Sequence, residues 1–127
     1  MGTVGQQVSV SAAISNSISG FSGLLYTCPA NSYAIINVYI GMTFSTNINT
    51  CRVFVGGQPV LLGQNTILVN GQSPTIIQSG NSESSAVNGL YVTKSGIVVG
   101  PGQEVTFNFS ASGGQVSISG VQFTNGS

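Results

Sequence analysis

Few residues in this chain could do chemistry: two cysteines, two glutamates, one lysine and one arginine, with no histidine and no aspartate. Without histidine the chain lacks the commonest general base and the commonest metal ligand. Glu83 and Glu104 are formally the carboxylate pair that glycoside hydrolysis requires, and they would have to lie within about 10 Å of each other. Glu83 falls instead in a serine-rich stretch and Glu104 directly follows a Gly-Pro-Gly-Gln turn, where a solvated carboxylate is the better explanation. We therefore predict that the chain is not an enzyme.

Metal and cofactor sites have equally little support in the sequence. A zinc site requires about four ligands from cysteine, histidine and carboxylate, and the two cysteines form no close C-x-x-C pair. Calcium would lack an aspartate to anchor it. The glycine-rich segment Gly100-Pro101-Gly102 is followed by no P-loop lysine, so it is interpreted as a turn. We expect neither a metal nor a cofactor.

Cys28 and Cys51 leave two hypotheses open. Cys28 ends one predicted strand immediately before Pro29, and Cys51 begins another after an asparagine-rich turn. A disulfide between them would stabilise the fold by about 3 kcal/mol on the chain-entropy estimate. The alternative is a pair of buried thiols that pack as small apolar residues, which is typical of a protein assembled in the cytoplasm.

The scarcity of charge restricts the class of partner. Only 3% of the residues are charged and the formal net charge is zero, whereas about a quarter of an average globular protein is charged. Zero net charge favours self-association or docking on a partner. Arg52 and Lys94 cannot form the basic stripe that nucleic acid requires, and no apolar run approaches the roughly 18 residues of a membrane span. We expect a module that binds neither nucleic acid nor membrane.

Hydrophobic periodicity predicts β-structure throughout. Val8, Val10, Ala12 and Ile14 alternate with small polar residues, as do the apolar positions of the segment 105–111. The segment 33–44 is apolar on both faces, which suggests a central strand or one packed against a neighbouring subunit. Shorter strands are predicted at 24–28, 52–55, 59–62, 66–69, 90–93 and 115–123, with turns rich in glycine, proline and asparagine between them.

This spacing predicts an all-β fold, an antiparallel β-sandwich of about eight or nine strands. Residues 1–7 are expected to form an N-terminal arm and residues 8–127 the single sandwich domain. Two local predictions accompany the fold. The apolar phase slips after Gly120, which indicates a β-bulge there, and residues 72–85 are interpreted as a long polar loop with one helical turn at most.

Four tyrosines, Tyr26, Tyr33, Tyr39 and Tyr91, are the remaining candidates for a site. A tyrosine ring has an apolar face and a polar tip, so it suits contact with sugar or protein, although strand packing is its usual role. The absence of tryptophan weakens the carbohydrate hypothesis. Loops often carry contacts, so the segment 72–85 and the turns near Gly56 and Gly113 are also candidate contact regions.

Two stretches resemble small tailed-phage virion proteins. The first, Leu25-Tyr26-Thr27-Cys28-Pro29-Ala30-Asn31-Ser32-Tyr33-Ala34-Ile35-Ile36-Asn37, is similar to their strand, Pro-Ala turn and strand. The second runs from Ile97-Val98-Val99-Gly100-Pro101-Gly102-Gln103 to the ending Ile118-Ser119-Gly120-Val121. The resemblance covers about half of the chain and implies a jelly-roll-like sandwich in a symmetric oligomer. Cys28 departs from the family, which more often carries an aliphatic residue there.

What the resemblance implies about function is a head decoration or cement protein that stabilises a phage capsid without doing chemistry. The implied partners are the major capsid protein and further copies of the chain, as a homotrimer, in a virion assembled in the host cytoplasm. The alternative is a receptor- or carbohydrate-binding module of a tail fibre or spike, which would use the loops at one end of the sandwich to bind a host surface glycan.

Overall fold

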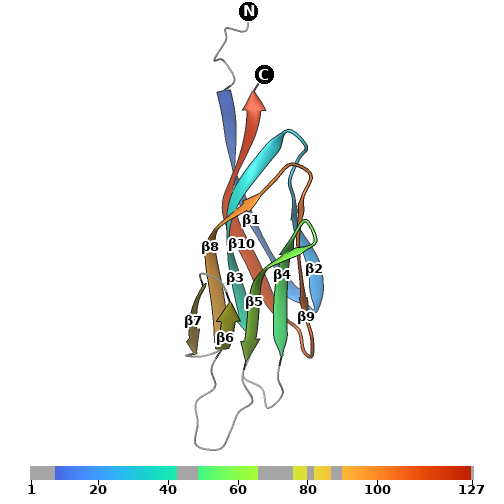
Figure 1. Ribbon diagram of the computed structural model, residues 1–127, viewed down its shortest axis with the longest axis vertical. Helices are drawn as coiled ribbons and strands as arrows, with labels where there is room; N and C mark the ends of the chain where they lie inside the picture. Colours follow the sequence, from blue (N-terminus) through green and yellow to red (C-terminus); the bar gives the residue numbers. More distant parts are fainter. Residues whose placement is uncertain (1–7, 43–48, 66–75, 80–81, 87–89, 127) are drawn as a thin grey trace, which may run out of the picture.

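In the computed structural model the chain folds into two antiparallel β-sheets that pack face to face (Figure 1). The structure describes residues 8–42, 49–65, 76–79, 82–86 and 90–126. The predicted arm, residues 1–7, and the predicted strand 66–69 lie outside these ranges. Within them, no helix is long and apolar enough to cross a membrane.

In the described part of the chain each sheet contains five strands. The first sheet has the order β1-β10-β3-β8-β7 and the second the order β2-β9-β4-β5-β6. The strands of the first sheet are β1 (Val8–Gly20), β3 (Ser32–Met42), β7 (Ser82–Ala86), β8 (Leu90–Val99) and β10 (Gly114–Gly126). Those of the second are β2 (Ser22–Thr27), β4 (Thr50–Val55), β5 (Gln58–Asn65), β6 (Ile76–Ser79) and β9 (Glu104–Phe109).

The pairing of the strands is nested. β1 pairs with β10, β2 with β9 and β3 with β8. The first half of the chain therefore runs antiparallel to the second half, and successive pairs alternate between the first and the second sheet. The predicted all-β antiparallel sandwich is therefore confirmed. The finer assignment, a jelly roll, stays a prediction with which this nested order agrees.

The predicted polar loop at 72–85 is wrong in part. It contains β6 and nearly all of β7, two strands that the sequence patterns did not predict. β6 pairs with β5 and β7 pairs with β8. β7 is rich in serine, which has weak strand propensity, and its pairing with β8 overrides that preference. β6 begins with two isoleucines, which favour a strand.

The core lies between the sheets and follows the alternation of the strands. Along β3 every even-numbered residue from Ala34 to Met42 is buried and every odd-numbered residue from Tyr33 to Tyr39 is exposed. The second sheet contributes Val53, Phe107 and Phe109, and the two phenylalanine rings meet edge to face with centroids 5.8 Å apart. Strands that bury one face therefore account for the fold, as the period of two in the sequence predicts.

The predicted β-bulge at Gly120 is absent. β10 pairs with β1 and with β3 without a register shift through this position. A Cβ at Gly120 would lie against the carbonyl oxygen of Ile35 and 2.8 Å from the Cα of Ile36, so glycine is required because β3 approaches closely. The apolar phase slips because Val121 and Phe123 face outward, as their partners Ile35 and Tyr33 do.

Asn49 ties the start of β4 to the connection between β9 and β10. Its side chain is 4% exposed, its Nδ2 donates to the carbonyl of Ser112 at 2.7 Å, and its Oδ1 accepts from the backbone N–H groups of Ala111 and Ser112 at 3.1 and 3.3 Å. Sequence analysis treated Asn49 only as part of a turn. Its role depends on residues more than 60 positions away, which a local pattern does not reveal.

We expect Gly120→Ala to lower the free energy of unfolding by about 2 kcal/mol, because the added methyl group would press on the backbone of β3. Denaturant unfolding measures the change. Ser119→Ala is the matched control, since Ser119 is exposed on the same strand and its replacement should cost under about 0.5 kcal/mol. Equal stability of the two variants would contradict the close-approach explanation.

Asn49→Ala should lower the free energy of unfolding by about 2 to 3 kcal/mol, because it leaves several backbone groups without their partner in a buried position. The control is Asn108→Ala, at an exposed position on β9. Thermal or denaturant unfolding of both variants measures the change. If Asn49→Ala and Asn108→Ala lower the free energy of unfolding by the same small amount, the hydrogen bonds of Asn49 do not stabilise the fold in this way.

Candidate functional site

The outer face of the first sheet carries a row of apolar side chains across four strands. Ala13 of β1 is opposite Val121 of β10, Val121 is opposite Ile35 of β3, and Ile35 is opposite Val98 of β8. Residues in register lie on the same face of a sheet. Val121, Ile35 and Val98 are 37%, 41% and 63% exposed, so the row is open to solvent.

An aromatic pair widens this row. Tyr33 of β3 is opposite Phe123 of β10, and their rings stack with centroids 5.0 Å apart at an interplanar angle of 22°. Offset stacking of this kind is a favourable arrangement of two rings and holds both in place. We call the whole set the apolar patch: Ala13, Tyr33, Ile35, Val98, Val121 and Phe123. Sequence analysis missed it because the outward turn of Val121 and Phe123 was explained as a bulge.

Next to the apolar patch, the same face becomes polar and is hollowed into a groove of about 510 Å³. Two rows of register partners on neighbouring strands line it. The first row is Ser15, Ser119 and Asn37, and the second is Ser17, Ser117, Tyr39 and Thr93. We call this region the hydroxyl groove. The hydroxyls of Ser17 and Ser117 are 2.8 Å apart, and Gln115 Nε2 donates to Ser17 Oγ at 2.8 Å.

The chemistry available in the hydroxyl groove is neutral. Asn37 Oδ1 accepts from the backbone N–H of Gly96 at 3.2 Å, at the bulge between β3 and β8, and the Tyr39 side chain is 41% exposed. Hydroxyls, an amide and an open aromatic ring can bind an uncharged molecule by hydrogen bonding and ring contact. Among the described residues that line this groove there is no carboxylate, imidazole or thiol.

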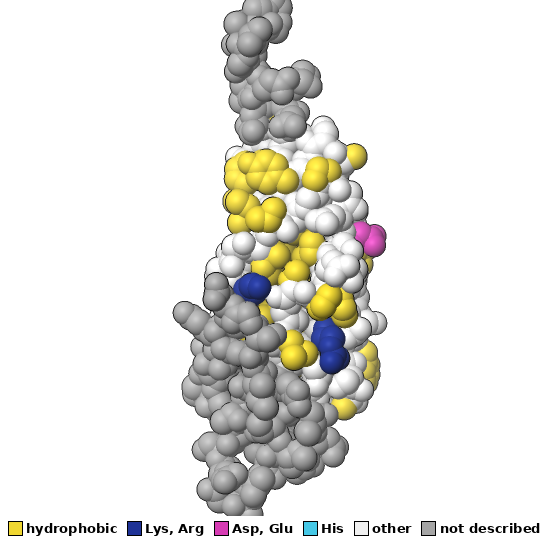
Figure 2. Space-filling view, viewed as in Figure 1, with side chains coloured by type: hydrophobic (Ala, Val, Ile, Leu, Met, Phe, Trp, Pro, Cys, Tyr) yellow, Lys and Arg dark blue, Asp and Glu magenta, His cyan; other side chains and the backbone are white. Residues whose placement is uncertain are grey.

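The charged side chains of the described residues are scattered and lie away from the apolar patch. Lys94 borders the hydroxyl groove, but its Nζ donates to the carbonyl of Val60 on the opposite sheet at 3.0 Å. Arg52 and Glu104 are exposed on the second sheet. On the face that Figure 2 presents, single charged side chains are set among apolar and neutral polar ones.

The two carboxylates lie on different sheets. Glu104 begins β9 and lines a second cleft of about 440 Å³ together with the turn residues Gly56, Gly57 and Gly102. Glu83 lies on β7 at the edge of the first sheet, and its side chain is outside what the structure describes. Among the described residues, no group of three or more Cys, Asp or Glu side chains is placed to hold a metal ion.

The four tyrosines have different places. Tyr33 and Tyr39 are on the outer face of the first sheet, as described above, and the side chain of Tyr91 is outside the described part. Tyr26 is half-buried, and its hydroxyl donates to Gln122 Oε1 at 2.6 Å, which joins the second sheet to the first. Burial, followed by a hydrogen bond with Cys28, raises the pKa of Tyr26 to about 12. Tyr26 is therefore a packing residue.

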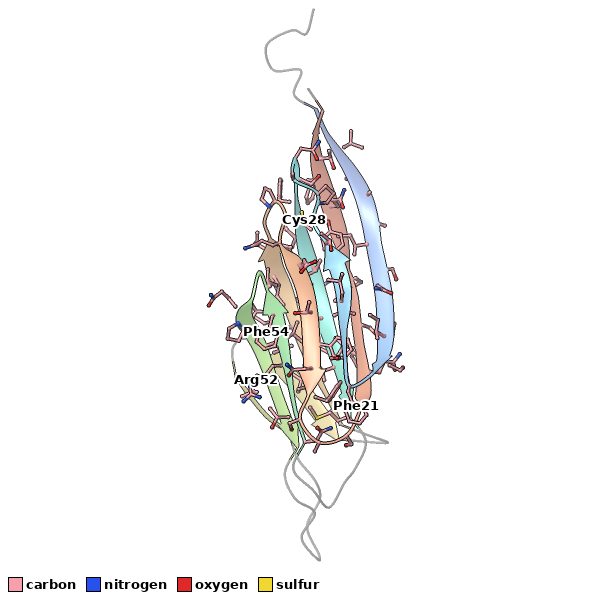
Figure 3. The ribbon with its side chains drawn as sticks, turned by 90° about the vertical axis from the view of Figure 1, so that its right-hand side faces the viewer. Phe21, Cys28, Arg52 and Phe54 are labelled. Atoms are coloured by element: carbon pink, nitrogen blue, oxygen red, sulfur yellow. The ribbon has the colours of Figure 1, made fainter. Side chains whose placement is uncertain are left out.

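Of the two hypotheses for Cys28 and Cys51, the structure agrees with the pair of thiols: both cysteines are free and buried. The backbone N–H of Cys28 donates to the carbonyl of Gln103 just before β9, whereas Cys51 is opposite Phe109 at the far end of β9. Gln103 and Phe109 are six residues apart on extended chain, which is about 20 Å. Cys28 and Cys51, which lie beside them, are therefore beyond the reach of a disulfide. Figure 3 shows Cys28 toward one end of the sandwich and Arg52, the neighbour of Cys51, toward the other.

Burial raises the pKa of the Cys51 thiol to about 12, and only the thiolate is reactive. We expect a thiol-specific chromogenic reagent to label almost none of the native protein at pH 8, and both cysteines once the protein is unfolded in denaturant without reductant. Fewer than two thiols after unfolding would restore the disulfide hypothesis.

Comparison with known proteins adds no assignment to this geometry. No protein-family model, no curated protein and no solved structure matches the chain.

Proposed function

We propose that this chain is a non-enzymatic structural protein of a phage particle, a head decoration protein that docks on the capsid through the apolar patch. The observation that carries the proposal is the exposed apolar row Ala13, Val121, Ile35 and Val98 with the Tyr33–Phe123 stack beside it. Soluble proteins rarely expose contiguous apolar patches larger than roughly a few hundred Å², and larger patches mark sites of interaction.

The position of the apolar patch also supports docking. Its side chains stand on β1, β10, β3 and β8, so hydrogen-bonded neighbours hold them in place before a partner arrives. A preformed surface loses little conformational entropy on binding. The centres of protein interfaces are enriched in aromatic residues and depleted in charge, and the patch has both properties.

The particle itself and the capsid partner are proposed from the resemblance to phage virion proteins, together with the low charge of the surface. A decoration protein remains on its shell, so broad neutral contact serves it better than the charged surface that keeps freely diffusing proteins apart. The nested sandwich is compatible with the jelly-roll-like fold of that family. The resemblance also implies a homotrimer, whereas the open edge of the first sheet favours a two-fold dimer in its place.

Ile35→Lys is the test variant, because it places an ammonium group in the centre of the patch where docking would desolvate it. We expect its binding to capsids that lack this protein to weaken at least tenfold, a change of about 1.4 kcal/mol or more, as measured by co-sedimentation. Asn108→Lys is the control, since it adds the same charge at an exposed position on the second sheet and should bind normally.

If the unaltered protein fails to sediment with capsids, the decoration role is wrong. If it binds and Ile35→Lys binds equally well, the role stands but the docking face lies elsewhere on the molecule. Circular dichroism and thermal unfolding of both variants exclude a loss of fold as the cause.

A second candidate function is carbohydrate binding, and the hydroxyl groove is the observation that favours it. Serine hydroxyls, the Asn37 amide and the open ring of Tyr39 offer an uncharged polyol both hydrogen bonds and a flat apolar contact. In this candidate the sugar would bind on the face of a sheet, whereas the alternative drawn from the sequence places it at the loops at one end of the sandwich. Calorimetric titration with host surface polysaccharide would distinguish the two functions. If the unaltered protein and Ile35→Lys both bind the polysaccharide and Tyr39→Ala does not, carbohydrate binding is supported over capsid docking.

A further inference from the structure

β1 is an open edge of the first sheet. Among the described residues it has β10 on one side and no strand on the other, and its 13 residues make it the longest of their four edge strands. The other edges are β2 with six residues, β6 with four and β7 with five. β2 is further interrupted by a bulge between Leu24 and Tyr26, whereas the 13 pairs between β1 and β10 proceed without a register shift.

One hydrogen bond shows which backbone groups of β1 face the open edge. The N–H of Ser17 donates to the side-chain Oδ1 of Asn16 at 2.9 Å, so this N–H is turned away from β10. In an antiparallel strand the backbone groups of alternate residues point to the same side. The N–H and C=O groups of Ser11, Ala13 and Ser15 therefore face the edge, and the hydrogen bonds of the described residues provide them with no partner.

β1 also lacks the features by which proteins protect an edge strand. Protected edges are short, bulged, or carry lysine, proline or an inward charge. From Val8 to Gly20 the sequence has no charged residue and no proline. Asn16 closes one end of the edge, because it covers the N–H of Ser17 and its Nδ2 donates to the carbonyl of Leu25 on the second sheet at 2.9 Å. The segment from Ser11 to Ser15 stays open.

We propose that this open segment pairs with the same segment of a second copy of the chain, in antiparallel register about a two-fold axis at Ala13. Ala13 then lies opposite Ala13 of the partner subunit, Ser11 opposite Ser15 of the partner subunit, and the first sheets of two copies join into one continuous sheet. The pairing is self-complementary because the segment is neutral and has a small residue at its centre.

The apolar row identifies a second copy as the occupant of this edge. The row Val98, Ile35, Val121 and Ala13 ends at β1, at the residue through which the two-fold axis passes. Antiparallel edge pairing keeps the outer faces of both sheets on the same side. In the dimer the apolar rows of the two copies therefore join into one continuous row across eight strands, four from each copy. A strand of unrelated sequence would interrupt the row at Ala13.

The first measurement is the mass of the full-length protein by light scattering with chromatography. We expect twice the chain mass of 12.9 kDa, and we expect Ala13→Lys to reduce it to a single chain, because two ammonium groups would meet at the axis. Ser19→Lys places the same charge on the same strand beyond Asn16 and should stay dimeric. A monomeric or trimeric unaltered protein, or a dimeric Ala13→Lys variant, overturns the proposal.

Cross-linking tests the register independently of mutations that break the contact. A short bifunctional thiol reagent should join two chains of Ala13→Cys, but not two chains of Ser11→Cys, and it should join Ser11→Cys to Ser15→Cys when the two are mixed. Cys28 and Cys51 are buried and do not compete. Equal cross-linking of Ala13→Cys and Ser11→Cys alone would show that the edge does not pair in this register.

Discussion

Burial of the inner faces of two sheets against each other is the constraint on which this structure depends. Each strand must place alternate side chains in a shared core, so a shift by one residue would exchange the inside for the outside along its whole length. The buried residues of β3 and of β9 both follow this alternation. At Gly120 the pairing continues without a break, and glycine is required there because the backbone of a neighbouring strand approaches closely. The outer face is thereby determined as firmly as the core, because every outward residue is set by its inward neighbours.

Sequence patterns predicted the class of fold and most of the strands, because alternation and turn residues are local signals. They did not predict β6 and β7, which lie in a stretch interpreted as a polar loop and take strand conformation through pairing with β5 and β8. They did not predict the apolar patch either, since Val121 and Phe123 could be assigned to one face only after their partners on β3 were known. The choice between a disulfide and two thiols stayed open for the same reason, because the positions of Cys28 and Cys51 along β9 depend on the register of the strands. Contacts between distant segments are the information that a single sequence lacks.

Scarcity of charge has different consequences inside and outside the sandwich. Inside, polar groups find neutral partners: Asn49 with the backbone at 111–112, and Tyr26 with Gln122. One cation, Lys94, crosses between the sheets to the carbonyl of Val60 and so joins a residue of β8 to an irregular point of β5. Outside, hydroxyl and amide groups take the place of ions, and apolar side chains lie among them without charged neighbours to weaken association. The same composition therefore gives a hydrogen-bonded core and a surface with few charges.

The ends of the sandwich domain adjoin each other: Val8 is the register partner of Gly126, and both strands extend beyond the rest of the sandwich (Figure 1). A short linker could join these ends into a closed ring, and the tight Gly56-Gly57 hairpin turn between β4 and β5 could serve as new ends, with the core pairs retained. For the same reason the domain can be inserted into a surface loop of another protein without stretching its host, because it enters and leaves at one point. Such an insertion would present the sandwich as a projecting module that is tethered at one end.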